Sequence, residues 1–392
     1  MRSEASGAGK KKLMVSAGEV SGDQHAARLL RGMGAAARGR LEVFGIGGDA
    51  MRAAGVDTRV GDAREMAVVG FWEVLKRLPT LWRIWRRALR ALDEEKPDAL
   101  LLVDYPGFNL RLAAAAKKRG IRVIYYISPQ VWAWNRGRIP KMAKIIDLLM
   151  VIFPFETEVF KGTGLRTEFV GHPLAESVAR TLEKPAAEMP WPAGEGRKVA
   201  LLPGSRRMEI ERIFPAMLDA AAELGRRRLG TRFLVAAAGE ETERMIRAAL
   251  AARGNPADVA VATGAMRDVV RTADAAMVCS GTATVETGLL GCPMIVVYRA
   301  AAMTYWLGKR LIRVPWLGMV NLISGKTLCP EFIQDDARAD AMADAVELLT
   351  EDTPERRAQV KGLAEVSRML SGKGVEGPGT LVACELRLEA GR

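Results

Sequence analysis

Small, hydroxyl and basic residues follow an apolar run in the segment LLPGSRRME. Val199–Leu202 is typical of a buried strand that ends at Pro203-Gly204. Ser205 is the expected N-cap of the helix that follows. Backbone N–H groups at a helix start favour a bound phosphate, and the guanidinium of Arg206 can hold that phosphate in bidentate fashion. The segment therefore predicts an anion site, and an ordinary strand-to-helix turn with solvated arginines is the alternative.

A second segment of this kind, SGTATVE, also follows a predicted strand and opens a helix. Ser280, Gly281 and Thr282 suit a pyrophosphate against the backbone. Glu286, one turn later, suits a ribose diol. The alternative is an N-capped helix with Glu286 on its surface. Two anion-suited loops at the same edge of one parallel sheet predict a site for a nucleoside diphosphate.

Two carboxylates are candidates for a general base. Asp104 follows the predicted buried strand Ala99–Val103, and Glu19 lies in a glycine-rich loop after the first strand. Ligands collect at the C-terminal edge of a parallel sheet, where a carboxylate can take the proton of an attacking hydroxyl. His25, just inside the first helix, is a weaker candidate. The alternative for Asp104 is that it caps a helix beginning near residue 108 or 109.

Apolar runs alternate with helical patterns along the chain, which predicts an α/β protein with parallel sheets and right-handed connections. A stretch rich in Pro, Ala and Glu separates two such series. We expect two doubly wound domains facing across a cleft. They are divided into a flexible leader at 1–12, a first α/β domain at 13–175, a linker at 176–198, a second α/β domain at 199–350, and C-terminal helices at 351–392, the last of which could return to the first domain.

Several local expectations follow from the same patterns. Asp23 is placed to cap the first helix, which is expected from about residue 24 to residue 33, and a ligand-binding role of the loop at residues 21–23 is the alternative. The helix after Ser205 is expected to reach about Arg228, with an interruption at Pro215. The strands of the second domain are expected at Val199–Leu202, Arg232–Ala237, Val259–Ala262, Ala275–Cys279 and Met294–Tyr298.

The composition limits the classes of protein to consider. The chain has 392 residues, 49% of them hydrophobic and 27% charged, and a formal net charge of +12. This positive charge favours nucleic acid, anionic lipid or phosphorylated substrates. The four cysteines lack C-x-x-C spacing, and no two aspartates have Asp-x-Asp spacing, so no metal site is expected. No G-x-G-x-x-G fingerprint and no apolar run of roughly 18 residues occurs, so we expect no dinucleotide cofactor and no membrane-spanning helix.

The densest basic stretch lies between residues 76 and 90 and alternates with large apolar residues. This pattern is typical of a helix at an anionic membrane surface more than of an isolated run of charges. The alternative is that part of the apolar face is core of the first domain, because Trp and Leu at helical spacing often pack inward. The residues expected to contact acyl chains are Val68, Val69, Phe71, Trp72 and Leu75, followed along the helix by Leu78, Trp82 and Trp85.

Six motifs together resemble the lipid-A-disaccharide synthase family over residues 13 to about 350. They are SAGEVSGD from Ser16, SPQVWAW from Ser128, FPFE from Phe153, VGHP from Val170, LLPGSR from Leu201 and SGTATVE from Ser280. The resemblance implies the two-domain GT-B glycosyltransferase fold. It also implies transfer of 2,3-diacylglucosamine from UDP to 2,3-diacylglucosamine 1-phosphate, which forms the β-1,6 disaccharide of lipid A.

By this resemblance the second domain holds UDP and the first receives the lipid acceptor at the membrane surface. Asp104 or Glu19 is then the base, and no cofactor is needed. A peripheral location on the inner face of the cytoplasmic membrane is expected, without nucleic acid, and a homodimer is left open. The residues expected to bind UDP are Ser205, Arg206, Ser280, Gly281, Thr282 and Glu286, with Asn321, Glu331 and Gln334 added by the likeness of the VNLI segment.

Two other readings share part of the pattern. A UDP-N-acetylglucosamine 2-epimerase, or another glycosyltransferase that uses UDP-N-acetylglucosamine, would have the same nucleotide domain. Neither needs the tryptophan-rich basic segment or the SPQVWAW motif. A basic RNA- or lipid-binding protein would explain the charge but not the paired phosphate loops. Stabilisation by UDP in a thermal-shift assay separates the nucleotide-binding readings from the last one.

Overall fold

The computed structural model describes residues 10–66, 71–311 and 314–388. Its contacts divide the chain into two compact units, Met1–Gly171 with Gly372–Arg392, and His172–Ser371. These limits differ from the expected 175 and 350. The stretch expected to be a linker begins with a helix, α10 (Pro173–Leu182), whose Ser177 and Thr181 accept hydrogen bonds from Arg267 in the second unit.

The first unit is built on a seven-stranded parallel sheet in the order β3-β2-β1-β4-β5-β6-β7. The order reverses between β1 and β4, and open α/β sheets bind ligands beyond the strand C-termini at such a point. Its strands are β1 (Lys11–Ala17), β2 (Leu41–Gly47), β3 (Asp57–Asp62), β4 (Ala99–Val103), β5 (Arg122–Tyr126), β6 (Leu148–Val151) and β7 (Arg166–Phe169).

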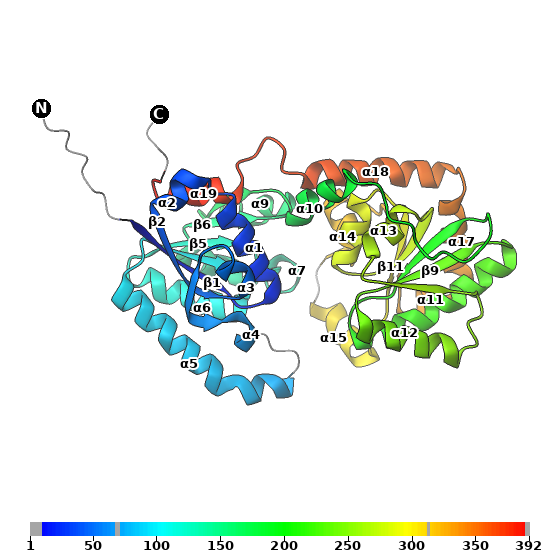
Figure 1. Ribbon diagram of the computed structural model, residues 1–392, viewed down its shortest axis with the longest axis horizontal. Coiled ribbons are helices and arrows are strands. Elements are labelled where there is room, and N and C mark those ends of the chain that lie inside the picture. Colours follow the sequence, from blue (N-terminus) through cyan, green and yellow to red (C-terminus); the bar gives the residue numbers. More distant parts are fainter. Residues whose placement is uncertain (1–9, 67–70, 312–313, 389–392) are drawn as a thin grey trace, which may run out of the picture. The chain divides into compact units, whose positions relative to one another are not determined.

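Helices cover both faces of this sheet, as Figure 1 shows. Strand β4 is buried along its whole length, with Leu101 and Val103 in one core and Leu100 and Leu102 in the other. A strand that is apolar on both faces is stable only between two helical layers. One layer contains α1 (Val20–Arg31), α2 (Ala35–Gly39), α3 (Asp49–Arg52) and α19 (Pro378–Glu385), and the other contains α5 (Phe71–Glu95), α6 (Pro106–Lys117) and α8 (Ile139–Ile145).

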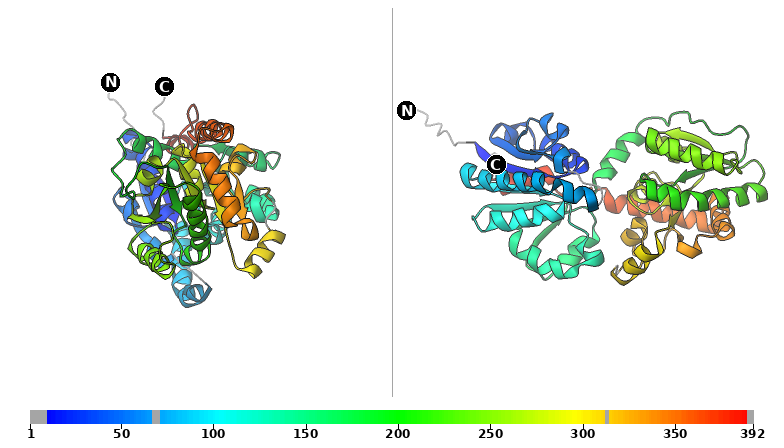
Figure 2. Two further views of the ribbon diagram at one scale, coloured as in Figure 1. Left: turned by 90° about the vertical axis from the view of Figure 1, so that its right-hand side faces the viewer. Right: turned by 90° about the horizontal axis from the view of Figure 1, so that it is seen from below.

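Three short helices complete the first unit, namely α4 (Ala63–Met66), α7 (Val131–Trp134) and α9 (Phe155–Phe160). The view from below in Figure 2 shows α5 lying along the sheet. Helix α19 comes from the C-terminal segment and packs beside α1, where Leu381 and Val382 join the same core as Leu29 and Leu30.

The second unit contains a six-stranded parallel sheet in the order β10-β9-β8-β11-β12-β13. Here the order reverses between β8 and β11. All five strands expected in this domain are present within one residue of their expected limits, and β13 was not expected. The strands are β8 (Lys198–Leu202), β9 (Arg232–Ala237), β10 (Ala260–Thr263), β11 (Ala275–Cys279), β12 (Met294–Tyr298) and β13 (Glu331–Ile333).

Two helical layers also cover the second sheet. The interruption expected at Pro215 is wrong, because α11 runs through this residue. Ile213, Phe214 and Met217 are fully buried around the proline, and their packing outweighs the lost backbone hydrogen bond. The helices are α11 (Arg207–Arg227), α12 (Glu240–Ala252), α13 (Met266–Arg271), α14 (Thr282–Leu289), α15 (Ala302–Leu311), α16 (Met319–Ser324), α17 (Ala339–Thr350) and α18 (Pro354–Leu370).

The described residues contain no helix long and apolar enough to cross a membrane. In the same part of the chain, no group of three or more His, Cys, Asp or Glu side chains is arranged to hold a metal ion. The cysteines are free thiols, with Cys279, Cys292 and Cys329 buried.

Candidate active site

Glu19 and Asp104 lie at the point where the strand order of the first sheet reverses. Strands β1 and β4 are neighbours, and their last residues, Ala17 and Val103, are paired in register. Gly18 and Glu19 therefore leave the sheet beside Asp104. A Cβ atom on Gly18 would lie 2.4 Å from the ring of Tyr105, so only glycine allows the two loops to approach this closely.

The backbone at Asp104 is held in an unusual conformation. Asp104 and Tyr105 both have φ of +48°, which costs a non-glycine residue roughly 1–2 kcal/mol. The carbonyl of Asp104 accepts hydrogen bonds from Asn109 Nδ2 at 2.7 Å and from the Tyr125 hydroxyl at 2.6 Å. Asn109 is fully buried and also binds Ser16, through its own Oδ1 and through the carbonyl of that serine. These contacts impose the strained turn that follows β4.

The surroundings of Asp104 raise the pKa of its carboxyl toward the neutral range. Burial, and to a lesser extent the nearby charge of Glu19, raise the pKa of its carboxyl to about 6, although a hydrogen bond from the Tyr105 backbone acts in the opposite direction. A base is most useful when its pKa lies near the working pH. Burial lowers the pKa of His25 to about 4, so this imidazole is neutral at pH 7.

Neither Asp104 nor Asp23 has the helix-capping role considered for it. Helix α6 begins at Pro106 with Tyr105 as its N-cap and receives no side-chain capping bond, so Asp104 does not cap it. The expectation that Asp23 caps the first helix is also wrong. Asp23 lies inside α1, and its carboxylate accepts the backbone N–H groups of Gly48, Ala50 and Met51 at the start of α3.

The loop after β8 does not present the free backbone donors that the sequence suggested. The carboxylate of Glu209 accepts the N–H groups of Ser205 at 3.0 Å and Arg206 at 3.2 Å, and it pairs with the Arg206 guanidinium. Arg206, not Ser205, is the N-cap of α11. Gly204 has φ of +108°, and a Cβ there would lie 2.4 Å from Glu209. A carboxylate of the chain itself thus lies at the expected anion position.

In the loop after β11, in contrast to the loop after β8, no carboxylate of the described residues occupies the backbone donors at the helix start. Gly281 has φ of +146° and is the N-cap of α14, which receives no side-chain capping bond. Among the described residues, no acceptor is recorded for the N–H groups of Thr282 and Ala283. The Ser280 hydroxyl donates to the Leu317 carbonyl at 2.9 Å. The start of α14, next to the point where the second sheet reverses, is the better phosphate position.

Glu286 lies one turn inside α14 and is mostly buried. Its carboxylate accepts a hydrogen bond from Arg267 Nε at 2.6 Å, and both side chains are largely shielded from water. Since Arg267 also reaches Thr181 and Ser177, Glu286 fixes α10 against α14. The alternative of a surface Glu286 is wrong, and its expected contact with a ribose stays a prediction.

Asn321, Glu331 and Gln334 make hydrogen bonds that position neighbouring backbone. The fully buried Asn321 accepts from the N–H groups of residues 328 and 329 and donates to Glu331 and to the carbonyl of residue 329. Glu331 accepts the N–H groups of Leu317 and Gly318. Gln334 both donates to and accepts from the backbone of Ala300. Direct contact of the three side chains with a nucleotide stays a prediction.

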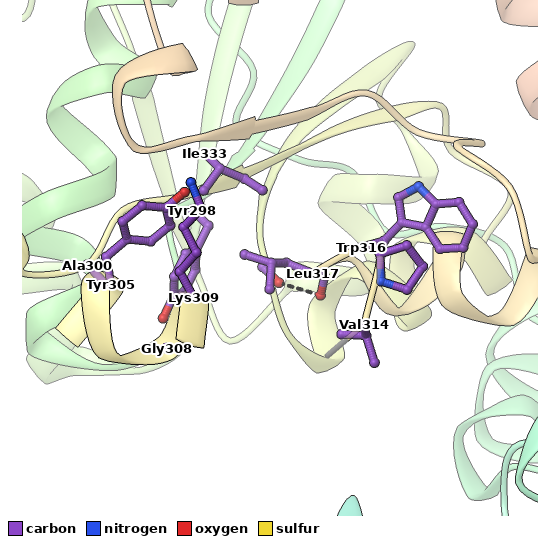
Figure 3. Close-up of a pocket in the computed structure, with 11 residues that line it drawn as sticks. Tyr298, Ala300, Tyr305, Gly308, Lys309, Val314, Trp316, Leu317 and Ile333 are labelled. Atoms are coloured by element: carbon purple, nitrogen blue, oxygen red, sulfur yellow. Dashed lines mark hydrogen bonds between the residues drawn. The ribbon is translucent and has the colours of Figure 1, made fainter. Parts of the chain in front are cut away.

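A pocket of about 590 Å³ lies within the second unit, beside the ends of β11, β12 and β13. Figure 3 shows Tyr298, Tyr305 and Lys309 on one side of it, and Val314 and Trp316 on the other. Sequence reasoning missed this pocket. The one available signal was Tyr298 at the end of a predicted strand. The remaining lining residues are Ser280, Ala300, Gly308, Pro315, Leu317 and Ile333.

The helix expected to contact the membrane divides into two faces where it is described. Ile84, Ala88 and Leu92 are buried in the core, whereas Leu78 and Trp82 are 50% and 60% exposed. Trp85 packs edge-on against Phe108, so part of the apolar pattern is core, as the alternative held. The guanidinium of Arg86 lies 4.7 Å from the Trp82 ring. Val68 and Val69, and the side chains of Phe71, Trp72 and Leu75, lie outside the described residues.

Solved structures with a similar fold include a glycosyltransferase and an epimerase bound to a UDP-sugar. The glycosyltransferase of kitacinnamycin has a TM-score of 0.60 and 17% identity, covering 96% of this chain and 97% of its own. UDP-GlcNAc 2-epimerase from Neisseria meningitidis, bound to UDP-GlcNAc, has a TM-score of 0.60 and 10% identity, covering 96% and 100%. At these identities the likeness shows the fold, which is the GT-B arrangement of two parallel-sheet units.

Sequence comparison is more specific. A family profile described as lipid-A-disaccharide synthetase matches residues 13–374. The lipid-A-disaccharide synthases of Geobacter metallireducens and Geobacter sulfurreducens are each 41% identical to this chain, over 367 and 366 residues. Each alignment covers 93% of this chain and 94% of the relative. The chain therefore belongs to the lipid-A-disaccharide synthase family of glycosyltransferases.

Proposed function

We propose that this chain transfers 2,3-diacylglucosamine from UDP to the 6-hydroxyl of 2,3-diacylglucosamine 1-phosphate. Asp104 takes the hydroxyl proton as the oxygen attacks the anomeric carbon, the bond to the diphosphate breaks, and UDP leaves with its electron pair. Attack from the opposite face inverts the anomeric centre. The observation that carries this proposal is the pair Glu19 and Asp104 at the reversal point of the first sheet, where burial adjusts Asp104 to act as a base.

In the second unit, the diphosphate is proposed to bind at the start of α14. The N–H groups of Thr282 and Ala283 and the positive end of the helix dipole suit its charge. Arg206, whose side chain is 81% exposed, is free to reach an anion if it leaves Glu209. The departing UDP carries the charge that these groups stabilise.

The direct test is turnover with a UDP-diacylglucosamine donor and a diacylglucosamine 1-phosphate acceptor, followed by mass spectrometry. We expect the disaccharide 1-phosphate and UDP in equal amounts. An enzyme of the epimerase class would instead convert UDP-N-acetylglucosamine to its 2-epimer without any acceptor, and that result would contradict the proposal.

Arg206→Ala is expected to weaken UDP binding by roughly 10- to 150-fold, because a charge-assisted hydrogen bond to phosphate contributes about 1.5–3 kcal/mol. Glu209→Gln is expected to tighten UDP binding, since it removes a negative charge from the same loop while keeping an acceptor for its N–H groups. Calorimetric titration with UDP measures both effects.

The matched control is Arg226→Ala, which breaks a similar pair with Glu223 near the other end of α11. It should leave UDP affinity unchanged. Unchanged affinity in Arg206→Ala would remove this residue from the nucleotide site.

The substrates carry acyl chains, and we propose that the segment around α5 holds the protein on an anionic membrane surface. The exposed Leu78 and Trp82 beside Arg86 have the composition of an interfacial face. This attachment would place the protein at the inner face of the cytoplasmic membrane.

Leu78→Ser with Trp82→Ser is expected to lower sedimentation with anionic vesicles by several-fold at moderate salt. Val68, Val69, Phe71 and Trp72 changed together to Ser should lower it further. The control is Leu229→Ser, because Leu229 is 90% exposed beside Arg228 but lies between α11 and β9 rather than on a helix face. Vesicle binding that survives both sets of changes would rule out this surface.

A further inference from the structure

The pocket beside β11, β12 and β13 has apolar walls. Tyr298 and Ile333 end two neighbouring strands of the sheet, which pair in register at these residues. Helix α15 contributes Tyr305 and the backbone at Gly308, and the segment after it contributes Val314 and Trp316. Figure 3 shows Tyr298 and Tyr305 on one side of the pocket and Val314 and Trp316 on the other.

Several polar groups around the pocket are already hydrogen-bonded within the protein. The Ser280 hydroxyl donates to the Leu317 carbonyl, and the N–H of Leu317 donates to Glu331. The N–H and carbonyl of Ala300 are both bound by Gln334. The indole N–H of Trp316 donates to Thr327, and Lys309 and two tyrosine hydroxyls are further polar side-chain groups of the lining. A buried polar ligand would leave most of its donors and acceptors unpaired here, at a cost in affinity.

We propose that this pocket binds an acyl chain of the sugar-nucleotide donor. The inference rests on the proposed function, which supplies a donor with acyl chains on its glucosamine. Ser280 belongs both to the pocket lining and to the loop proposed for the diphosphate. The pocket therefore begins next to the proposed diphosphate site and continues along apolar surface. The donor has the same order of groups, since its diphosphate is charged and its acyl chains are apolar.

The outer face of α15 agrees with a lipid ligand. Met303 and Trp306 are 77% and 52% exposed, and the Arg310 guanidinium lies 3.8 Å from the Trp306 ring. The helix has no acidic residue in its first turn, and its last turn holds Lys309 and Arg310. Exposed Met and Trp next to cations are typical of a surface at the headgroup level of an anionic membrane. Helix α15, which forms one wall of the pocket, is thus suited to the membrane surface, where an acylated donor resides.

Two other occupants fit less well. A nucleobase would bury its carbonyl and N–H groups against surface whose polar atoms are largely engaged. A second copy of this chain joined by a two-fold axis at α15 would bring Lys309 and Arg310 close to the same cations. The methylenes of an acyl chain need no hydrogen-bond partners and bring no positive charge. Their binding becomes more favourable with each methylene removed from water.

The test compares the affinities of UDP and UDP-2,3-diacylglucosamine for the wild type and for Ala300→Phe, with the lipid below its aggregation concentration. In the wild type the acylated donor is expected to bind at least about tenfold more tightly than UDP. Ala300→Phe places a ring in the pocket. It is expected to reduce the gain, defined as the affinity for the acylated donor relative to that for UDP, to about twofold or less, while UDP affinity stays the same. The control is Ala301→Phe, one residue outside the lining, which should keep the full gain.

Ile333→Thr is a second variant, which shortens the side chain and exchanges apolar pocket surface for a hydroxyl. It keeps the proposal testable if Ala300→Phe fails to fold, and it is expected to reduce the gain by about threefold or more. A gain that is unchanged in the folded variants, with UDP still bound, would overturn the acyl pocket and leave the proposed function intact. Failure of the wild type to bind UDP would contradict the proposed function itself.

Discussion

Asp104→Asn is expected to lower turnover by roughly 10²- to 10⁴-fold while leaving UDP affinity unchanged, because the variant loses the proposed general base. Asparagine tolerates the left-handed backbone of this position well, so the turn after β4 should persist. Turnover, UDP affinity and melting temperature should be measured on the same preparation. A nearly full rate for this variant would assign the role of base to Glu19.

The pH dependence gives an independent check. Since the pKa of Asp104 is about 6, the rate should fall approximately tenfold for each pH unit below that value as the carboxylate becomes protonated. Glu19→Gln removes a charge that raises this pKa, so the acidic limb of the profile should move to lower pH. If Glu19 were the base, the same variant would instead abolish most of the activity.

Ionisation of Asp104 is expected to increase activity but to lower the stability of the fold. Burial and Glu19 raise the pKa above its ordinary value of 3.8, so the ionised side chain reduces the stability of the fold progressively from about pH 4 to pH 6. The uncharged Asp104→Asn should therefore keep or raise the melting temperature at pH 7. A clear fall in melting temperature together with retained activity would indicate a structural role instead.

Asn321→Ala is expected to lower the free energy of unfolding by about 2–4 kcal/mol, because it leaves the buried N–H groups of residues 328 and 329 without their acceptor. It also removes a donor from Glu331, whose carboxylate orients Leu317 and Gly318 beside the pocket. For a unit of this size we expect a fall in the unfolding midpoint of roughly 5–15 °C. Thermal and denaturant unfolding both measure the effect.

The matched control is Thr287→Val in the neighbouring helix α14. The Thr287 hydroxyl is buried and, among the described residues, has no hydrogen-bond partner. Replacing it with an apolar side chain of similar shape should be neutral or stabilising by up to about 1 kcal/mol. Equal losses of stability in the two variants would show that Asn321 acts through packing and not through its hydrogen bonds.

Sequence alone determined the parts of this protein that depend on residues close together in the chain. Runs such as Ala275–Cys279 and Met294–Tyr298 have the limits expected of them, since an apolar strand between turn residues needs little information from elsewhere. The same holds for the placement of Glu19, Asp104 and Ser280 directly after strands. The motifs also carried the family resemblance that the sequence comparisons confirm.

Tertiary structure decided which polar groups are engaged and which are open. Glu209 meets the donors of Ser205 and Arg206, a contact that the spacing permitted but that the strand-turn-helix pattern did not reveal. Asp23 reaches residues 48–51, and Glu286 reaches Arg267, across separations that no local pattern encodes. The pocket beneath α15 likewise joins residues from Ser280 to Ile333. Such partners are set by how strands and helices pack, because a buried polar group must find its hydrogen bond wherever the fold brings one near.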